Sequence, residues 1–260
     1  MEAEDQPWRN LRFTISYDGT AYSGFQIQPT SDTIQQRLEE AVYLLTGERV
    51  KVASSGRTDA GVHAKAQVIN FTTQSKIPVE RWCLALNARL PKDIVAHTAE
   101  EVHPSFHSRK AAKRKTYCYT IRSARFPDVF HRNYEYHHPT HLDVEAMREA
   151  LPCLLGEHDF TSFCTVRTDK EVKVRTLYEA RMVLETDELG GEGKVERIRL
   201  IFTGNGFLYN MVRIIVGTLI QIGEGKRPSS DMQRILEALD RSQAGPTAEA
   251  MGLMLWRVEY

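Results

Sequence analysis

The order of its predicted strands and helices is the feature that most constrains the fold of this chain. In residues 11–102, alternating apolar and polar side chains predict strands, and apolar side chains three or four residues apart predict helices. The order is strand, helix, strand, strand, helix, strand. Residues 116–258 give the same order with one added helix, although the halves share no detectable sequence similarity. Two passes through this order predict two ferredoxin-like, or split βαβ, modules.

We therefore predict an α+β protein with one module in residues 1–105 and the other in residues 106–260. Their mainly antiparallel sheets are expected to join into one large mixed sheet, because pairing hides strand edges that promote aggregation. The helices are expected to cover one face, which leaves the other face, or a cleft between the modules, open for a long ligand. A glycine-rich hairpin turn is expected at 187–194.

The composition is that of an ordinary soluble globular protein, with 42% hydrophobic and 26% charged residues and a formal net charge of zero. The polar N-terminal residues do not resemble a signal peptide, and the longest apolar run, 207–222, is interrupted and too short to cross a bilayer. We therefore expect a cytoplasmic protein that makes no membrane contact.

Motifs for metals and common cofactors are missing from the sequence. The four cysteines are scattered and form no Cys-x-x-Cys pair, which argues against a zinc site and a disulfide framework. The histidines between residues 131 and 141 have no ligand-like spacing. The sequence contains no phosphate-binding loop and no dinucleotide fingerprint. We therefore expect no metal and no cofactor.

A short loop, residues 54–64, is dense in functional groups and lies between strands predicted at 50–53 and 68–72. It carries Arg57 and Asp59 between two glycines, which permit unusual backbone angles or close approach of a ligand. Arg57 and Asp59 could form a simple ion pair, worth about 0–1 kcal/mol if exposed. Alternatively, Asp59 is a carboxylate nucleophile and Arg57 is directed at a phosphate or a base. His63 is expected to have a structural or RNA-contacting role rather than that of a base.

A single charged residue, Arg213, lies within the otherwise apolar or uncharged stretch 207–221. This stretch predicts a helix from about Leu208 to Ile222, and a helix that is apolar nearly all round is largely buried. A buried arginine needs an anionic partner, because an unpaired buried charge costs several kcal/mol. Asp59 is a candidate for this partner. The alternative is that Arg213 lies at the helix edge and extends to water.

Residues 106–126 contain seven lysines or arginines and no acid. Such a segment can follow a phosphate backbone or can simply be a solvated surface. Tyr117 and Tyr119 follow the basic residues on a predicted strand, and an aromatic ring beside cations suits stacking on an unpaired RNA base. Tyr119 is more simply explained as a core residue. The predicted RNA-binding residues are Arg109, Lys110, Lys113 and Arg114.

Together these segments resemble the tRNA pseudouridine synthase A family over nearly the whole chain. The motif Gly-Arg-Thr-Asp-Ala-Gly-Val-His-Ala at 56–64 resembles the signature loop of that family. The segments 17–25, 106–119, 156–163 and 207–217 resemble four further blocks. Ser108 and Cys118 depart from the residues common in the family, and neither touches the proposed chemistry.

The resemblance implies a homodimeric isomerase that converts uridine to pseudouridine at positions 38–40 of the tRNA anticodon stem-loop, without cofactor or metal. It implies Asp59 as the essential carboxylate, Arg213 as its partner and Tyr117 as the residue that stacks on the target base. It also implies that Arg57 holds the target nucleotide out of the stack and that Leu253 lines the pocket. The alternatives are a non-catalytic RNA-binding protein and a nucleoside hydrolase, which normally needs a second carboxylate.

Overall fold

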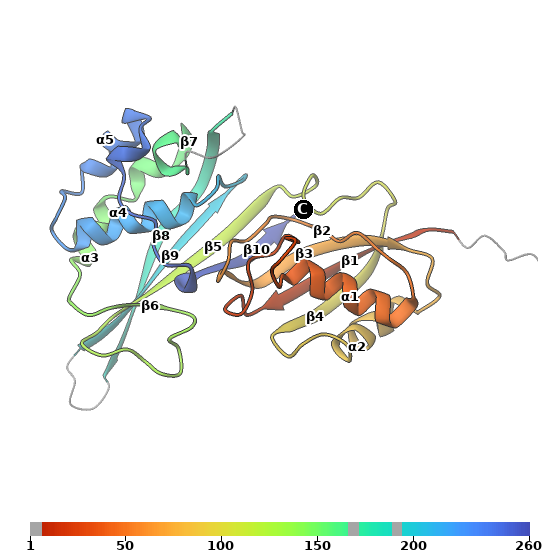
Figure 1. Cartoon of the computed structure of the whole chain (residues 1–260). Helices are drawn as coiled ribbons and strands as arrows, with labels where there is room; N and C mark the ends of the chain where they lie inside the picture. The colour runs from red at the N-terminus through yellow and green to blue at the C-terminus, as the bar shows by residue number, and fades with distance from the viewer. Residues whose placement is uncertain (1–6, 166–171, 189–193) are drawn as a thin grey trace, which may run out of the picture. The chain divides into compact units, whose positions relative to one another are not determined.

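A computed structural model describes residues 7–165, 172–188 and 194–260, which belong to two compact units (Figure 1). The first unit comprises Met1–Lys113 and Leu255–Tyr260, and the second comprises Arg114–Met254. Compared with the predicted modules, the first unit also includes residues 106–113 and the last six residues. The predicted turn at 187–194 falls mainly on residues outside the described part.

The first unit is a sheet with two helices. Its strands lie in the order β4-β1-β3-β10, β2 also pairs with β3, and β1 is antiparallel to both of its neighbours. The strands are β1 (Arg9–Tyr17), β2 (Ala53–Ser54), β3 (His63–Thr73), β4 (Ile94–Val102) and β10 (Leu253–Glu259). The helices are α1 (Ile34–Thr46) and α2 (Trp82–Asn87), and a 3-10 turn, Val79–Arg81, precedes α2. Strand β10 begins in the last two residues of the second unit.

The core of the first unit follows from the alternation in β1, as the sequence predicts. Every second residue of this strand is buried, from Leu11 to Tyr17. The ring of Trp82 at the start of α2 packs edge-on against Phe13 and Phe71, with centroid distances of 6.0 and 5.6 Å. These two phenylalanines are themselves stacked at 5.2 Å. Aromatic burial therefore fixes α2 against β1 and β3.

Some predicted boundaries in the first unit are wrong. The strand expected at 50–53 is only Ala53–Ser54, and the strand expected at 68–72 already begins at His63. The end of the signature loop is therefore part of β3. The sequence favours Asp32 as the cap of helix α1. The cap is Thr33, whose hydroxyl accepts the Gln36 N–H. Asp32 instead forms an ion pair with Arg37.

The second unit is a mixed sheet with three helices. Strands lie in the order β5-β9-β8-β7 with antiparallel neighbours, and β6 pairs in parallel with β5. The strands are β5 (Arg114–Ser123), β6 (Tyr136–His138), β7 (Gly156–Asp159), β8 (Val174–Glu188) and β9 (Lys194–Gly204), and the helices are α3 (Val144–Glu149), α4 (Met211–Gly223) and α5 (Asp231–Ala238). Short 3-10 turns occur at Pro152–Leu154, Thr161–Phe163, Arg241–Gln243 and Ala250–Gly252. The α+β class is confirmed.

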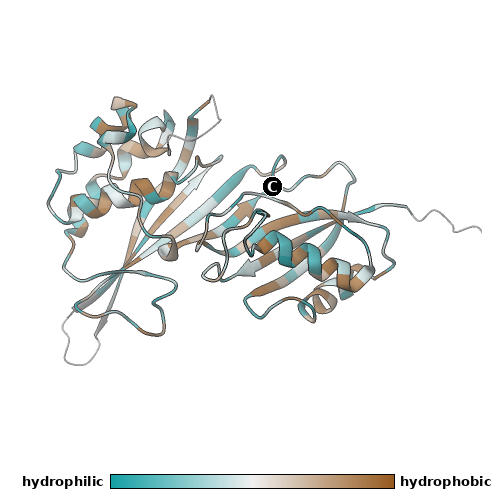
Figure 2. Cartoon of the chain, in the orientation of Figure 1, coloured by the Kyte–Doolittle hydropathy of each residue, from teal (hydrophilic) through white to brown (hydrophobic). Residues whose placement is uncertain are grey.

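Helix α4 is the most apolar helix of the second unit, as Figure 2 shows. It is buried almost throughout, as its sequence predicts. It begins at Met211 rather than near Leu208, because Asn210 takes left-handed backbone angles and ends the preceding turn. Tyr119 is fully buried in this unit, and its hydroxyl donates to the Glu249 carbonyl, which confirms its predicted place in the core. Among the described residues, no helix is long and apolar enough to cross a membrane.

Candidate active site

The signature loop is fixed to the sheet of the first unit by buried side chains. The Tyr17 hydroxyl, at the end of β1, lies 2.8 Å from Thr58 Oγ1. Gln67 of β3 donates from Nε2 to the Gly56 carbonyl at 2.8 Å and accepts at Oε1 from the Ser55 hydroxyl at 2.6 Å. Asp59 directly follows Thr58, so these contacts hold the backbone on which Asp59 is mounted.

Asp59 itself begins a tight turn. Its carbonyl accepts the Val62 N–H at 3.1 Å, and Gly61 within this turn has a φ of +75°. The turn packs against residues 22–25. Gly24, with a φ of +96°, passes so close that a Cβ there would lie 2.8 Å from the Thr58 carbonyl oxygen. Asp59 is half-buried on this rigid turn, which suits a carboxylate that must meet one atom of a substrate.

His63 joins the end of the signature loop to the turn after β1. It is buried, and its Nδ1 lies 3.0 Å from the Gly19 N–H and 3.1 Å from Asp18 Oδ1. An unprotonated Nδ1 accepts from Gly19, whereas a protonated Nδ1 donates to Asp18. In either case the imidazole holds backbone in place, which agrees with the expected structural role.

Arg57 differs from its neighbours in the loop because its side chain is exposed. Within the described residues it forms neither an ion pair with Asp59 nor a hydrogen bond with another side chain. The simple local ion pair considered from the sequence is therefore absent from this part of the chain. An exposed guanidinium next to the rigid turn remains suitable for a phosphate or a base.

In the second unit, Tyr117 and Arg213 lie on β5 and α4. Tyr117 is 8% exposed, and its ring meets the Phe207 ring edge-on, with centroids 4.9 Å apart. Arg213 donates from Nε to the Ala248 carbonyl at 2.7 Å and from Nη1 to Asn210 Oδ1 at 3.1 Å. Arg213 is thus partly buried and is oriented by its own unit. Leu253, at the start of β10, is buried.

The predicted site residues are divided between the two units. Asp59 and Arg57 belong to the first unit, whereas Tyr117, Arg213 and Leu253 belong to the second. Each unit therefore holds its own set in a defined geometry. The pairing of Asp59 with Arg213 stays a prediction.

The basic segment is exposed but well anchored. The side chains of Arg109, Lys110, Lys113 and Arg114 are all exposed. Beneath them, buried Ser108 donates its N–H to Asn70 Oδ1 and accepts from the Tyr260 hydroxyl, both at 2.8 Å. The anchors lie 38 and 152 residues away in sequence, so no local pattern could have predicted them.

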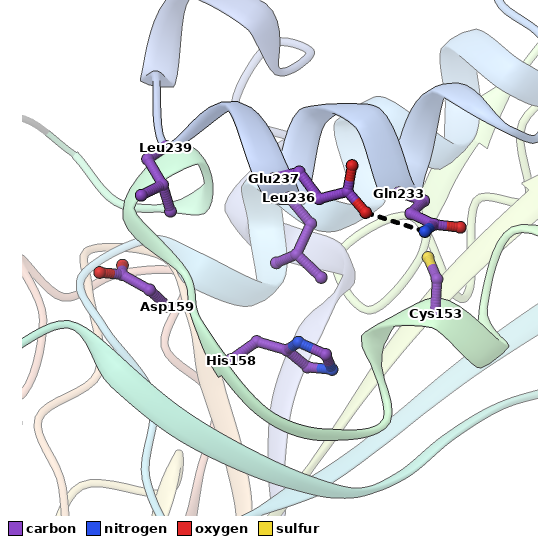
Figure 3. A pocket seen from close by; sticks show the side chains of 7 residues that line it. All are labelled: Cys153, His158, Asp159, Gln233, Leu236, Glu237 and Leu239. Atoms are coloured by element: carbon purple, nitrogen blue, oxygen red, sulfur yellow. Dashed lines mark hydrogen bonds between the residues drawn. The ribbon is translucent and has the colours of Figure 1, made fainter.

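The second unit also contains a pocket of about 420 Å³ (Figure 3). None of the predicted site residues lines it. Its lining comprises Cys153, His158, Asp159, Gln233, Leu236, Glu237 and Leu239. Its polar groups serve local structure: His158 Nε2 lies 2.7 Å from the Leu155 carbonyl, and Gln233 donates to Glu237 at 2.8 Å. The described residues contain no group of three or more side chains that could hold a metal ion.

Comparisons with known proteins identify the family of this chain. The family model described as tRNA pseudouridine synthase matches residues 14–133 and 150–260. A Geobacillus protein named tRNA pseudouridine synthase A is 49% identical over 97% of this chain and 98% of its own length. A protein of the same name from Brevibacillus brevis is 49% identical over 97% of this chain and 100% of its own length. Another from Bacillus subtilis is 48% identical over 96% of this chain and 98% of its own length. The chain is therefore a member of the tRNA pseudouridine synthase family.

Proposed function

We propose that this protein converts uridine to pseudouridine at positions 38–40 of the tRNA anticodon stem-loop, with Asp59 as the nucleophile. The observation that carries the proposal is the rigid turn that presents Asp59 within the loop that resembles the signature of this family. Asp59 attacks the ribose C1′, or stabilises an intermediate there, as the N-glycosidic bond breaks. The uracil turns and rejoins the ribose through C5, so uridine and product have the same atoms.

The target base must leave the stack before it can react, at a cost of a few kcal/mol. Exposed Arg57 is suited to hold the nucleotide in its extruded position. The Tyr117 ring, which packs edge-on against Phe207, is proposed to stack on the base, and stacking is worth on the order of 1–3 kcal/mol per base. Leu253 is proposed to line the site of the extruded base, which is not the pocket of Figure 3, and to limit escape of the uracil after it has been released.

Arg213 is the proposed partner of Asp59. A carboxylate beside a guanidinium stays ionised and therefore stays available as a nucleophile. The hydrogen bonds from Arg213 to Ala248 and Asn210 support this role, because they fix the guanidinium before substrate binds. The exposed basic segment, Arg109 to Arg114, would meet the phosphate backbone.

We also propose the ferredoxin-like modules, a homodimer and a cytoplasmic location. The first-unit order β4-β1-β3, with β2 also on β3 and antiparallel neighbours, supports a split βαβ module. The dimer rests on the family resemblance.

The test is pseudouridine mapping on an anticodon stem-loop tRNA incubated with the purified protein, its Asp59→Asn variant and, as a control carboxylate, its Asp32→Asn variant. We expect product from the wild type and from Asp32→Asn, and at least a roughly 1,000-fold slower reaction from Asp59→Asn with tRNA binding kept. Product formation by Asp59→Asn at the wild-type rate would exclude the nucleophile role. Binding without product from the wild type would indicate a non-catalytic RNA-binding protein, and release of free uracil would indicate a hydrolase.

A further inference from the structure

Asn210 has an unusual backbone conformation for a residue at the start of a helix. Its φ is +60°, in the left-handed region, which most residues with a side chain avoid. An asparagine at this position usually has extended angles and accepts a hydrogen bond from the first turn of the helix. Here the Asn210 side chain caps no N–H of α4. Its amide is used elsewhere.

The Asn210 amide joins Arg213 to Thr165. Its oxygen accepts from Arg213 Nη1 at 3.1 Å, and its nitrogen donates to Thr165 Oγ1 at 2.9 Å. A guanidinium only donates hydrogen bonds, so the amide oxygen must face Arg213 and the nitrogen must face Thr165. Thr165 is held in turn by its own N–H, which donates to the Tyr209 carbonyl at 3.2 Å.

We propose that Asn210 is a positioning residue that sets the orientation of the Arg213 guanidinium. This inference rests on the proposed function, in which Arg213 serves Asp59. The Ala248 carbonyl accepts the hydrogen bond from Arg213 Nε, and Asn210 Oδ1 accepts one from Arg213 Nη1. Nε is therefore engaged, and in this proposal a carboxylate meets Arg213 end-on, through Nη1 and Nη2. The left-handed backbone of Asn210 is what brings its amide within reach.

Three substitutions distinguish the effect of the Asn210 side-chain amide from the effect of its backbone conformation. Asn210→Gly keeps the left-handed angles and removes the amide, whereas Asn210→Ala removes the amide and adds backbone strain. Thr165→Val removes only the acceptor of the amide nitrogen. Leu239→Gly is the matched control, because Leu239 is the other described non-glycine residue with positive φ, at +51°, and lies at the end of α5.

We expect Asn210→Gly to lower kcat about tenfold, equivalent to about 1.4 kcal/mol, with KM for tRNA and the melting temperature nearly unchanged. Asn210→Ala should lower kcat equally and also lower the melting temperature. Thr165→Val should lower kcat about threefold and Thr165→Ser should restore it, while Leu239→Gly keeps the wild-type kcat. A wild-type kcat for Asn210→Gly would overturn the inference, as would a loss confined to stability. An inactive wild type would instead overturn the proposed function.

Discussion

The Tyr17 hydroxyl and the Thr58 hydroxyl lie 2.8 Å apart in the core of the first unit. Tyr17 ends β1, and Thr58 is the residue before Asp59. Gln67 of β3 lies 3.4 Å from the same phenol and also holds the Gly56 carbonyl. The loop that carries the proposed nucleophile is thus tied to two adjacent strands by side chains rather than by backbone pairing alone.

Replacing Tyr17 by Phe should weaken this attachment. The free energy of unfolding should fall by about 1–2 kcal/mol, because buried Thr58 and Gln67 lose a hydrogen-bonding partner. We expect kcat to fall several-fold with KM for tRNA unchanged. Urea unfolding measures the loss of stability, and single-turnover kinetics measure the loss of rate.

Tyr22→Phe is the control, since the Tyr22 hydroxyl donates to Asp93 and not to the loop. If both variants reacted at the same rate, Tyr17 would have no special link to the loop.

Gly24→Ala should damage the site more than an ordinary glycine substitution. The new methyl would meet the Thr58 carbonyl at 2.8 Å and would add left-handed strain. We expect a loss of at least about 2 kcal/mol in stability and a clear loss of activity.

Gly47→Ala is the matched control. It has the same kind of strain, with a φ of +77° at the end of α1, but open space around it. It should lose only about 1–2 kcal/mol and keep its kcat. Thermal unfolding and pseudouridine assays compare the pair.

The basic segment should contribute to tRNA affinity in a salt-dependent way. We expect the double variant Lys110→Gln, Lys113→Gln to bind tRNA more weakly. The slope of log K against log salt should decrease by roughly 0.7–0.9 for each phosphate that the variant no longer neutralises. Lys51→Gln, an exposed lysine outside the segment, should leave the slope unchanged. Filter binding across a salt series is the measurement, and equal slopes for both variants would show that the segment is only a solvated surface.

Stability should fall in alkaline solution because of buried tyrosines. Burial raises the pKa of Tyr17 to about 12, and burial raises the pKa of Tyr119 as well. In an unfolded chain the tyrosine hydroxyls release their protons at about pH 10. Between about pH 10 and 12 the folded protein therefore holds more protons, and stability decreases as pH rises. Urea unfolding at about pH 8, 10 and 11 measures this slope. It should be smaller in Tyr17→Phe, and an unchanged slope would contradict the assignment to Tyr17.

The parts of the fold that have long periodic patterns could be predicted from the sequence. The alternation in β1 and the apolar length of α4 identify both elements, because each buries a whole face. Strands β6 and β7 have only three and four residues. A period of two cannot be recognised over so few positions, and their pairing depends on neighbours that are distant in the sequence.

The candidate site likewise has residues that could be predicted from the sequence and residues that could not. The proposed site residues Asp59 and Arg213 could be singled out in the sequence, one by its motif and the other as a lone charge in an apolar stretch. Their supports, Gln67 and Asn210, could not. The hydrogen bonds of Gln67 and Asn210 leave no periodic signal because they depend on the folded backbone around them, and a left-handed asparagine looks in sequence like any helix cap.

The first unit is discontinuous in sequence, and this has a consequence for its synthesis. Its last six residues include Tyr260, whose hydroxyl holds the Ser108 carbonyl beneath the basic segment. At roughly 5–20 residues per second, a ribosome needs on the order of 10 s to travel from Ser108 to Tyr260. The whole second unit is made within that interval. The basic segment therefore reaches its anchored form only after translation has passed the second unit and Tyr260 has been added to the chain.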